Sequence, residues 1–97
     1  MTNFKTKPKR SPAYMAFIRE QPCCLSGATI GIESHHEAPE GHGTMGGKPC
    51  DSRCVPVEWK LHRKMESPGN SRKEIWEKYG KDPEEVIQAM RQKWIDA

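Results

Sequence analysis

The chain is organised around residues 33–62, ESHHEAPEGHGTMGGKPCDSRCVPVEWKLH. The stretch opens with a pair of histidines, His35 and His36, and continues through a glycine-rich segment to Asp51. A third histidine, His62, stands near its end. Imidazole is the commonest protein ligand for transition metals and the neutral base best suited to near-neutral pH. Histidines brought together by this stretch can divide those two tasks between them.

The pattern around the histidines predicts two short strands and a helix. Residues 29–33 alternate apolar and polar side chains, which indicates a half-buried strand running into the histidine pair. Residues 38–49 contain four glycines without apolar rhythm and are expected to be irregular. Residues 53–55 are expected to form the returning strand, and Pro56 suits the first turn of a helix that carries the third histidine.

Helices are predicted on both sides of this region. Ser11 followed by Pro12 is typical of a helix start, and we expect a helix over residues 12–20. Two further helices are expected in residues 71–96, the first ending near Tyr79 and the second starting at Asp82 and Pro83. Apolar side chains in these helices are expected to cover the small sheet and to supply most of the core.

Length and composition indicate one small α+β domain spanning residues 1–97. Only 34% of its 97 residues are hydrophobic, so its core must be thin. We expect a flexible basic arm at residues 1–10, a central unit at 29–66 and helices at 71–96. The sequence contains neither a membrane span nor the apolar run of a signal peptide, and we expect a cytoplasmic protein with reduced cysteine thiols.

The positive charge is unevenly distributed, although the formal net charge is only +3. Residues 1–19 carry five basic side chains and no acidic one. A second basic group surrounds the third histidine. Lysines and arginines that neutralise phosphates release condensed counterions, so this distribution favours a polyanion such as DNA. The alternative is that the basic terminus is only a solvated tail.

Several segments resemble one family of nucleases. The histidine pair, the glycine-rich loop, Asp51, and His62 within WKLHRK are similar to the HNH nucleases. The segments RSPAYMAFIREQPC, HHEAPEGHGTMGGKPCD and VPVEWKLHRKM are similar to small phage and prophage HNH proteins, and EIWEKYGKD extends the similarity towards the C-terminus. This resemblance implies a ββα-metal finger in which a two-stranded antiparallel sheet and a helix hold one divalent cation. One N-terminal and two C-terminal helices are expected to pack around it.

The resemblance also implies roles for individual residues. His35 and His62 match the metal ligands, and His36 matches the general base that takes a proton from the attacking water. Asp51 matches the position that orients this base, although the usual spacing of the motif would place that position at Arg53. Adjacent residues of a strand point to opposite faces, so the histidine pair can converge only if the strand bends or ends there.

The sequence departs from many relatives at the positions of a structural zinc. Where those relatives have paired cysteines or a histidine, this chain has Cys23-x-x-Ser26 and Glu58-x-x-Leu61. We therefore expect no structural zinc; the alternative is a site rebuilt from Cys24, Cys50 and Cys54. The catalytic ion is expected to be Mn²⁺ or Mg²⁺, with Co²⁺, Ni²⁺ and Zn²⁺ as alternatives.

The resemblance, together with the distribution of positive charge, implies a metal-dependent endonuclease that hydrolyses phosphodiester bonds in double-stranded DNA. A monomer with one active centre would nick one strand, whereas a homodimer could cut both. Six basic residues are expected to contact the DNA backbone: Arg10, Lys48, Arg53, Lys60, Arg63 and Lys64. Two alternatives remain: a non-catalytic DNA-binding module for phage assembly or recombination, and a metal-buffering or structural protein.

Overall fold

The computed structural model describes residues 10–37, 50–69 and 71–97. Within these ranges the chain forms a two-stranded antiparallel sheet and four α-helices, which confirms the predicted α+β class. The elements, in chain order, are α1 (Pro12–Arg19), β1 (Ile32–His36), the 3₁₀ helix η1 (Asp51–Arg53), β2 (Cys54–Glu58), α2 (Trp59–Met65), α3 (Ser71–Lys78) and α4 (Pro83–Asp96). The expected basic arm, apart from its last residue, and the glycine-rich loop lie outside the described residues.

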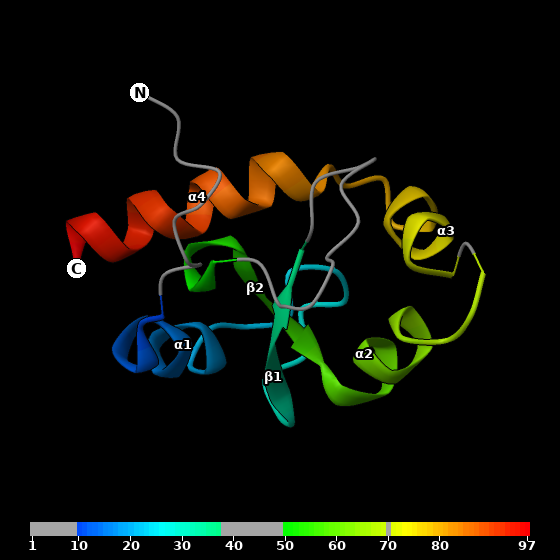
Figure 1. Cartoon of the computed structure of the whole chain (residues 1–97), viewed down its shortest axis with the longest axis horizontal. Coiled ribbons are helices and arrows are strands. Elements are labelled where there is room, and N and C mark those ends of the chain that lie inside the picture. The colour runs from blue at the N-terminus through cyan, green and yellow to red at the C-terminus, as the bar shows by residue number, and fades with distance from the viewer. Residues whose placement is uncertain (1–9, 38–49, 70) are drawn as a thin grey trace.

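The hairpin of β1 and β2 lies at the centre of the molecule (Figure 1). Helix α1 packs beside it on one side, α2 and α3 lie on the other, and α4 runs along the β2 side (Figure 1). No helix in the described ranges has the length and apolar character that a membrane crossing requires.

The two faces of β2 belong to two apolar clusters. Val55 and Val57 are fully buried in the larger cluster, together with Trp76 of α3 and Ile87 of α4. Cys54 is fully buried in the smaller cluster, which α1 completes. Side chains alternate along a strand, so neighbouring residues of this hairpin are directed to different helices. The same alternation governs β1 and separates its two histidines.

The first strand begins later than the sequence pattern predicts. The alternation of apolar and polar residues predicts that the strand includes residues 29–31. In the structure, however, Ile30 is 84% exposed and Gly31 has a φ of +71°. This left-handed conformation is easily reached only by glycine, and it interrupts the extended backbone before Ile32. The strand instead continues through His36, which pairs with Cys54 across the hairpin.

The prediction that Pro56 begins a helix is wrong, because Pro56 lies within β2. A sheet of only two strands leaves each strand with an outer edge, where the missing N–H of proline costs no ladder hydrogen bond. The Pro56 carbonyl accepts a hydrogen bond from the Cys24 N–H at 2.9 Å. Helix α2 begins at Trp59, because the Glu58 carboxylate caps it by accepting from the N–H groups of the two residues after Trp59, at 2.7 and 3.2 Å.

The predicted starts of two other helices are confirmed. The Ser11 hydroxyl accepts a hydrogen bond from the Tyr14 N–H at 3.2 Å, with Pro12 in the first turn of α1. The Asp82 carboxylate caps α4 by accepting from the Glu84 N–H at 3.1 Å. Both caps satisfy an N–H group that has no partner within its helix.

Candidate metal and catalytic site

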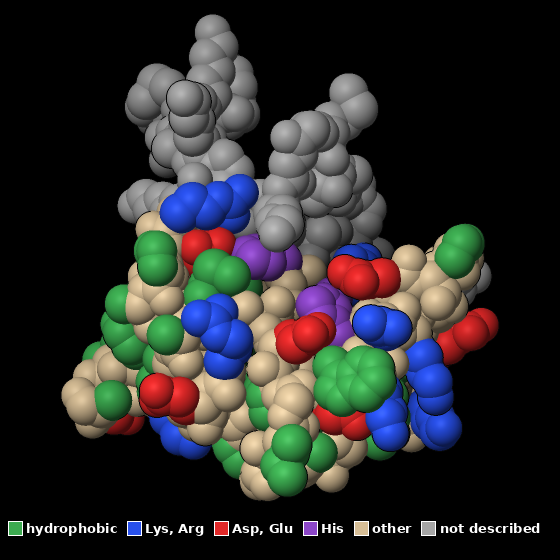
Figure 2. Space-filling model, turned by 90° about the horizontal axis from the view of Figure 1, so that it is seen from below, with side chains coloured by type: hydrophobic (Ala, Val, Ile, Leu, Met, Phe, Trp, Pro, Cys, Tyr) green, Lys and Arg blue, Asp and Glu red, His purple; other side chains and the backbone are tan. Residues whose placement is uncertain are grey.

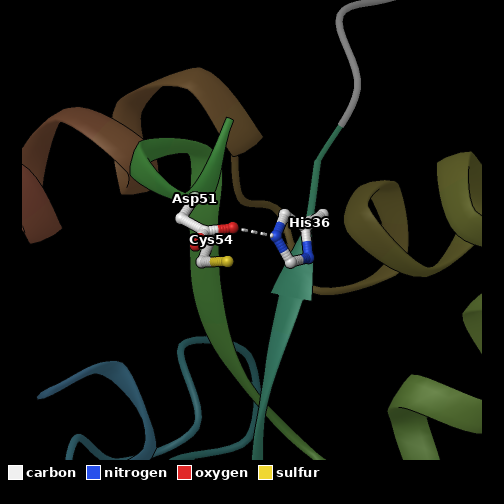
Figure 3. A group of neighbouring side chains, drawn as sticks. All are labelled: His36, Asp51 and Cys54. Carbon is white, nitrogen blue, oxygen red and sulfur yellow. Dashed lines mark hydrogen bonds and ion pairs between the residues drawn. The ribbon is translucent and has the colours of Figure 1, made fainter. Parts of the chain in front are cut away.

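Three potential metal ligands meet where β1 ends and β2 begins. His36 is the last residue of β1, and the strand register places it opposite Cys54. Asp51 reaches the same place from the first residue of η1. One ligand atom of each residue lies within 4.8 Å of the other two. In Figure 3, Asp51 and Cys54 project from one side of the hairpin towards the His36 ring.

The strongest contact in this group joins His36 to Asp51. The His36 Nε2 atom lies 2.8 Å from Oδ1 of Asp51, and both side chains are largely buried. Asp51 also accepts a hydrogen bond from the Ser11 N–H at 2.6 Å and another from the Arg10 guanidinium at 3.1 Å. Burial acts to raise the pKa of Asp51, but these three hydrogen bonds outweigh it and hold the pKa below its ordinary value.

The ionised carboxylate of Asp51 determines which ring nitrogen of His36 carries a hydrogen. A carboxylate can only accept hydrogen bonds, so the His36 Nε2 atom carries the shared hydrogen. In the neutral imidazole the Nδ1 atom then keeps its lone pair. This arrangement suits a general base, because a buried carboxylate stabilises the imidazolium that forms when Nδ1 accepts a proton.

His35 points to the opposite face of β1 and belongs to a second group of polar residues. Its Nε2 atom lies 2.7 Å from Oε2 of Glu37, and both side chains are buried. The His35 ring meets the His62 ring edge to face, with 5.0 Å between the ring centroids. The structure therefore brings the two expected metal ligands together from β1 and α2.

Carboxylates surround these two imidazoles. The His62 Nδ1 atom lies 2.7 Å from Oε1 of Glu33, and its Nε2 atom lies 3.6 Å from the Glu66 carboxylate one helical turn later. The group thus contains two imidazoles, and each of them is hydrogen-bonded to a carboxylate. Imidazole nitrogens suit Mn²⁺, Co²⁺, Ni²⁺ or Zn²⁺ as ligands. Among the described residues, however, only His36, Asp51 and Cys54 bring three possible ligand atoms within 4.8 Å of one another.

Glu33, Glu37, Glu66 and Cys54 are absent from the site that the sequence predicts. The spacing of the three glutamates from the histidines could have predicted that they lie beside them. Glu33 and Glu37 stand two residues before and after His35, and a period of two places them on its face of the strand. Glu66 follows His62 by four residues, which is one turn of a helix. Cys54 lies next to His36 only because of the strand register, and this register cannot be read from the sequence.

Arg53 and Asp51 occupy different environments. Asp51 contacts His36, whereas the Arg53 side chain donates to the Glu37 carbonyl at 2.7 Å and forms an ion pair with Glu84 of α4. The hydrogen bond from Arg53 lowers the pKa of Glu84. Of these two residues, Asp51 is the one that contacts His36.

Of the other expected DNA contacts, Lys60, Arg63 and Lys64 belong to α2, the helix that carries His62. Lys60 and Arg63 stand over the ring of Trp59, at 5.6 and 5.2 Å from its centroid, and Trp59 is 39% exposed. Lys64 lines a shallow hollow between α2 and α3, and Lys48 lies outside the described residues. Figure 2 shows histidine side chains near the middle of one face, with acidic and basic side chains beside them.

Comparisons with known proteins place the chain in one family. No matching protein was found among curated sequences, and no matching fold was found among solved structures. The family described as "Protein of unknown function (DUF968)" matches residues 1–95, which is nearly the whole chain. The chain therefore belongs to the DUF968 family.

Proposed function

We propose that this protein is a metal-dependent endonuclease that hydrolyses phosphodiester bonds in DNA. In this proposal His36 is the general base, Asp51 orients it, and His35 and His62 hold one divalent cation in a ββα-metal finger made of β1, β2 and α2. The observation that carries the proposal is the partly buried hydrogen bond of 2.8 Å between His36 and Asp51. The resemblance of the sequence to HNH nucleases supports it independently.

The His36–Asp51 pair supplies the proton transfer. With its Nε2–H held by Asp51, the His36 ring presents the Nδ1 lone pair to a water molecule. The Asp51 carboxylate is itself fixed by Ser11 and Arg10, so the ring has a defined orientation before substrate binds. A general base positioned in this way typically contributes about 100- to 10,000-fold to the rate.

The His35–His62 pair supplies the cation site. A bound divalent cation would neutralise charge that develops on the phosphoryl oxygens and on the leaving oxygen. The two histidines reach the site from different elements, so the cation site depends on the packing of α2 against β1. The strand β1 ends at His36, and in this proposal His35 and His36, although on opposite faces, approach the same phosphodiester at that end.

Positive charge near the site favours DNA as the substrate. Lys60 and Arg63 lie in the same helix as His62, and Arg10 contacts Asp51 beside His36. Side chains of this kind position a phosphate backbone without reading the base sequence. The proposal is therefore for binding through the phosphate backbone of DNA; a monomer would nick one strand, and a homodimer could cut both.

One observation favours a second candidate function. His36, Asp51 and Cys54 place a nitrogen, an oxygen and a sulfur ligand atom within 4.8 Å of one another. A cation held there would occupy His36 and prevent it from acting as a base. The protein would then be a metal-stabilised DNA-binding module without catalytic activity.

Conversion of supercoiled plasmid to open-circle DNA tests these alternatives. We expect conversion in Mn²⁺ or Mg²⁺, none in EDTA, and a rate about 100-fold or more lower in His36→Ala. Cys54→Ala serves as the matched control, because it removes the third member of the group next to His36 while keeping the base. We expect Cys54→Ala to cleave at nearly the wild-type rate.

Two outcomes would contradict the nuclease proposal. One is plasmid that stays supercoiled in every metal while its mobility still shifts with protein. The other is cleavage that persists unchanged in His36→Ala purified free of host nucleases. A sulfur-to-cobalt charge-transfer band in the Co²⁺-loaded protein, absent from Cys54→Ala, would support the second candidate instead.

A further inference from the structure

Glu37 lies at the centre of a buried hydrogen-bond network outside the residues assigned above. Its Oε2 atom is 2.7 Å from the His35 Nε2 atom and 2.8 Å from the Trp76 Nε1 atom. The Arg72 guanidinium lies 3.7 Å from its other oxygen. The Glu37 side chain is only 4% exposed, and α3 supplies two of its three neighbours.

Trp76 and His35 both contact the Oε2 atom of Glu37, and the contact with Trp76 limits how the carboxylate can meet His35. Indole can only donate, so Trp76 fixes Oε2 as an acceptor and holds the carboxylate in one orientation. As an ionised carboxylate, with the Arg72 guanidinium 3.7 Å from its other oxygen, Glu37 can only accept from His35. The His35 Nε2 atom therefore carries the hydrogen, and the Nδ1 atom keeps its lone pair.

We propose that Glu37 is a positioning residue for His35: it fixes the Nε2–H tautomer and directs the Nδ1 lone pair to the cation. This inference rests on the proposed function, because it takes His35 as a metal ligand. Metal-bound imidazoles commonly donate their second N–H group to a carboxylate, which fixes the ring and increases its basicity. Loss of such a partner typically weakens metal binding about 10- to 100-fold.

The network also gives α3 a role in the site. Trp76 is 3% exposed and packs in the larger apolar cluster with Val55, which pairs with His35 across the hairpin. The Arg53 side chain donates to the Glu37 carbonyl at 2.7 Å and so fixes the backbone of the same residue. Glu37 is thus held at both its backbone and its side chain, as a positioning group requires.

Nitrogen NMR of the metal-free protein tests the tautomer without any activity. Two-bond ¹H–¹⁵N correlations distinguish the nitrogen that carries hydrogen in each histidine ring. For the wild type, in solution basic enough to keep imidazole neutral, we expect the Nε2–H tautomer at His35. In Glu37→Leu no acceptor faces the ring, and we expect the Nδ1–H tautomer to become populated. Glu37→Gln should keep the wild-type tautomer, because the Trp76 indole can only donate and holds the amide oxygen at the position of Oε2. An Nδ1–H tautomer or a doubly protonated ring in the wild type would overturn the proposal.

Calorimetric titration with Mn²⁺ or Co²⁺ tests the consequence. We expect Glu37→Leu to bind the ion about 10- to 100-fold more weakly than the wild type. Glu74→Gln, which makes the same change of charge on the exposed side of α3, should bind like the wild type. Thermal unfolding of the metal-free variants shows whether each one is folded.

Comparison with His35→Ala separates the two proposals. If His35→Ala abolishes ion binding while Glu37→Leu leaves it unchanged in a folded protein, the role of Glu37 is disproved and the metal site stands. If the ion binds equally well to His35→Ala, the metal site itself is wrongly placed. Trp76→Phe keeps the His35–Glu37 contact and should lose stability while retaining the Nε2–H tautomer.

Discussion

The indole of Trp59 packs against Gly31, and the backbone N–H of Trp59 donates to the Gly31 carbonyl at 2.9 Å. A Cβ atom at residue 31 would lie 2.6 Å from Cδ1 of the indole. This contact joins the residue before β1 to the first residue of α2. It therefore helps to set the distance between His35 on the strand and His62 on the helix.

Substitution of Gly31 by alanine should destabilise the fold more than the same change at Gly27. Both glycines have positive φ, +71° and +79°, so each alanine carries a strain of about 1–2 kcal/mol. Only residue 31 meets the indole, whereas nothing lies within 4 Å of a Cβ at residue 27. We expect Gly31→Ala to lower the free energy of unfolding in urea by at least about 1 kcal/mol more than Gly27→Ala. Equal effects would mean that Trp59 moves aside at no cost.

Replacement of Asp51 by asparagine should lower stability near neutral pH by about 1–3 kcal/mol, because three donors then meet an amide in place of a carboxylate. The folded pKa of Asp51 lies below its unfolded value of about 4. Its stabilisation is therefore complete above that unfolded value and is lost as the pH falls through the folded pKa.

The difference in unfolding free energy between wild type and Asp51→Asn should consequently shrink on acidification. Urea unfolding of both proteins over a pH series measures it. Glu74→Gln provides the control and should follow the wild-type pH profile, since the Glu74 side chain is exposed on α3. A difference that stays constant down to the lowest pH would show that Asp51 does not stabilise the fold through its charge.

Removal of two cations beside Trp59 should weaken DNA binding and reduce its dependence on salt. Each phosphate that is no longer neutralised lowers the slope of log K against log salt by about 0.9, so Lys60→Ala/Arg63→Ala should lower it by about 2. Anisotropy of a labelled duplex in EDTA measures binding without cleavage. Lys93→Ala, on α4, should leave the slope unchanged. An unchanged slope in the double variant would remove this surface from the DNA interface.

Local signals in the sequence identify the helices well. The pairs Ser11-Pro12 and Asp82-Pro83 each combine a capping side chain with a residue suited to the first turn, and both helices begin there. The prediction failed at Pro56 because proline is equally acceptable at the open edge of a two-stranded sheet. The sequence around Pro56 does not show whether this strand will lie at the edge of its sheet.

The site is only partly predictable for a different reason. The resemblance to HNH nucleases indicates His36 and Asp51 as site residues. Their hydrogen bond joins residues 15 positions apart in the sequence, so it depends on the register of the hairpin. The strand period alone places Glu37 on the same face as His35. Its contact with Trp76 does not follow from that period, because 39 positions separate the two residues and only the packing of α3 joins them.

The burial of Trp76 provides an optical probe inside the molecule. Its indole is 3% exposed, whereas Trp59 and Trp94 are 39% and 41% exposed. An aqueous quencher such as iodide should therefore suppress the emission of the two exposed indoles and leave mainly that of Trp76. The Trp76 indole N–H and the His35 ring are hydrogen-bonded to the same oxygen of Glu37. The fluorescence that remains should therefore respond to changes at His35, without any added label.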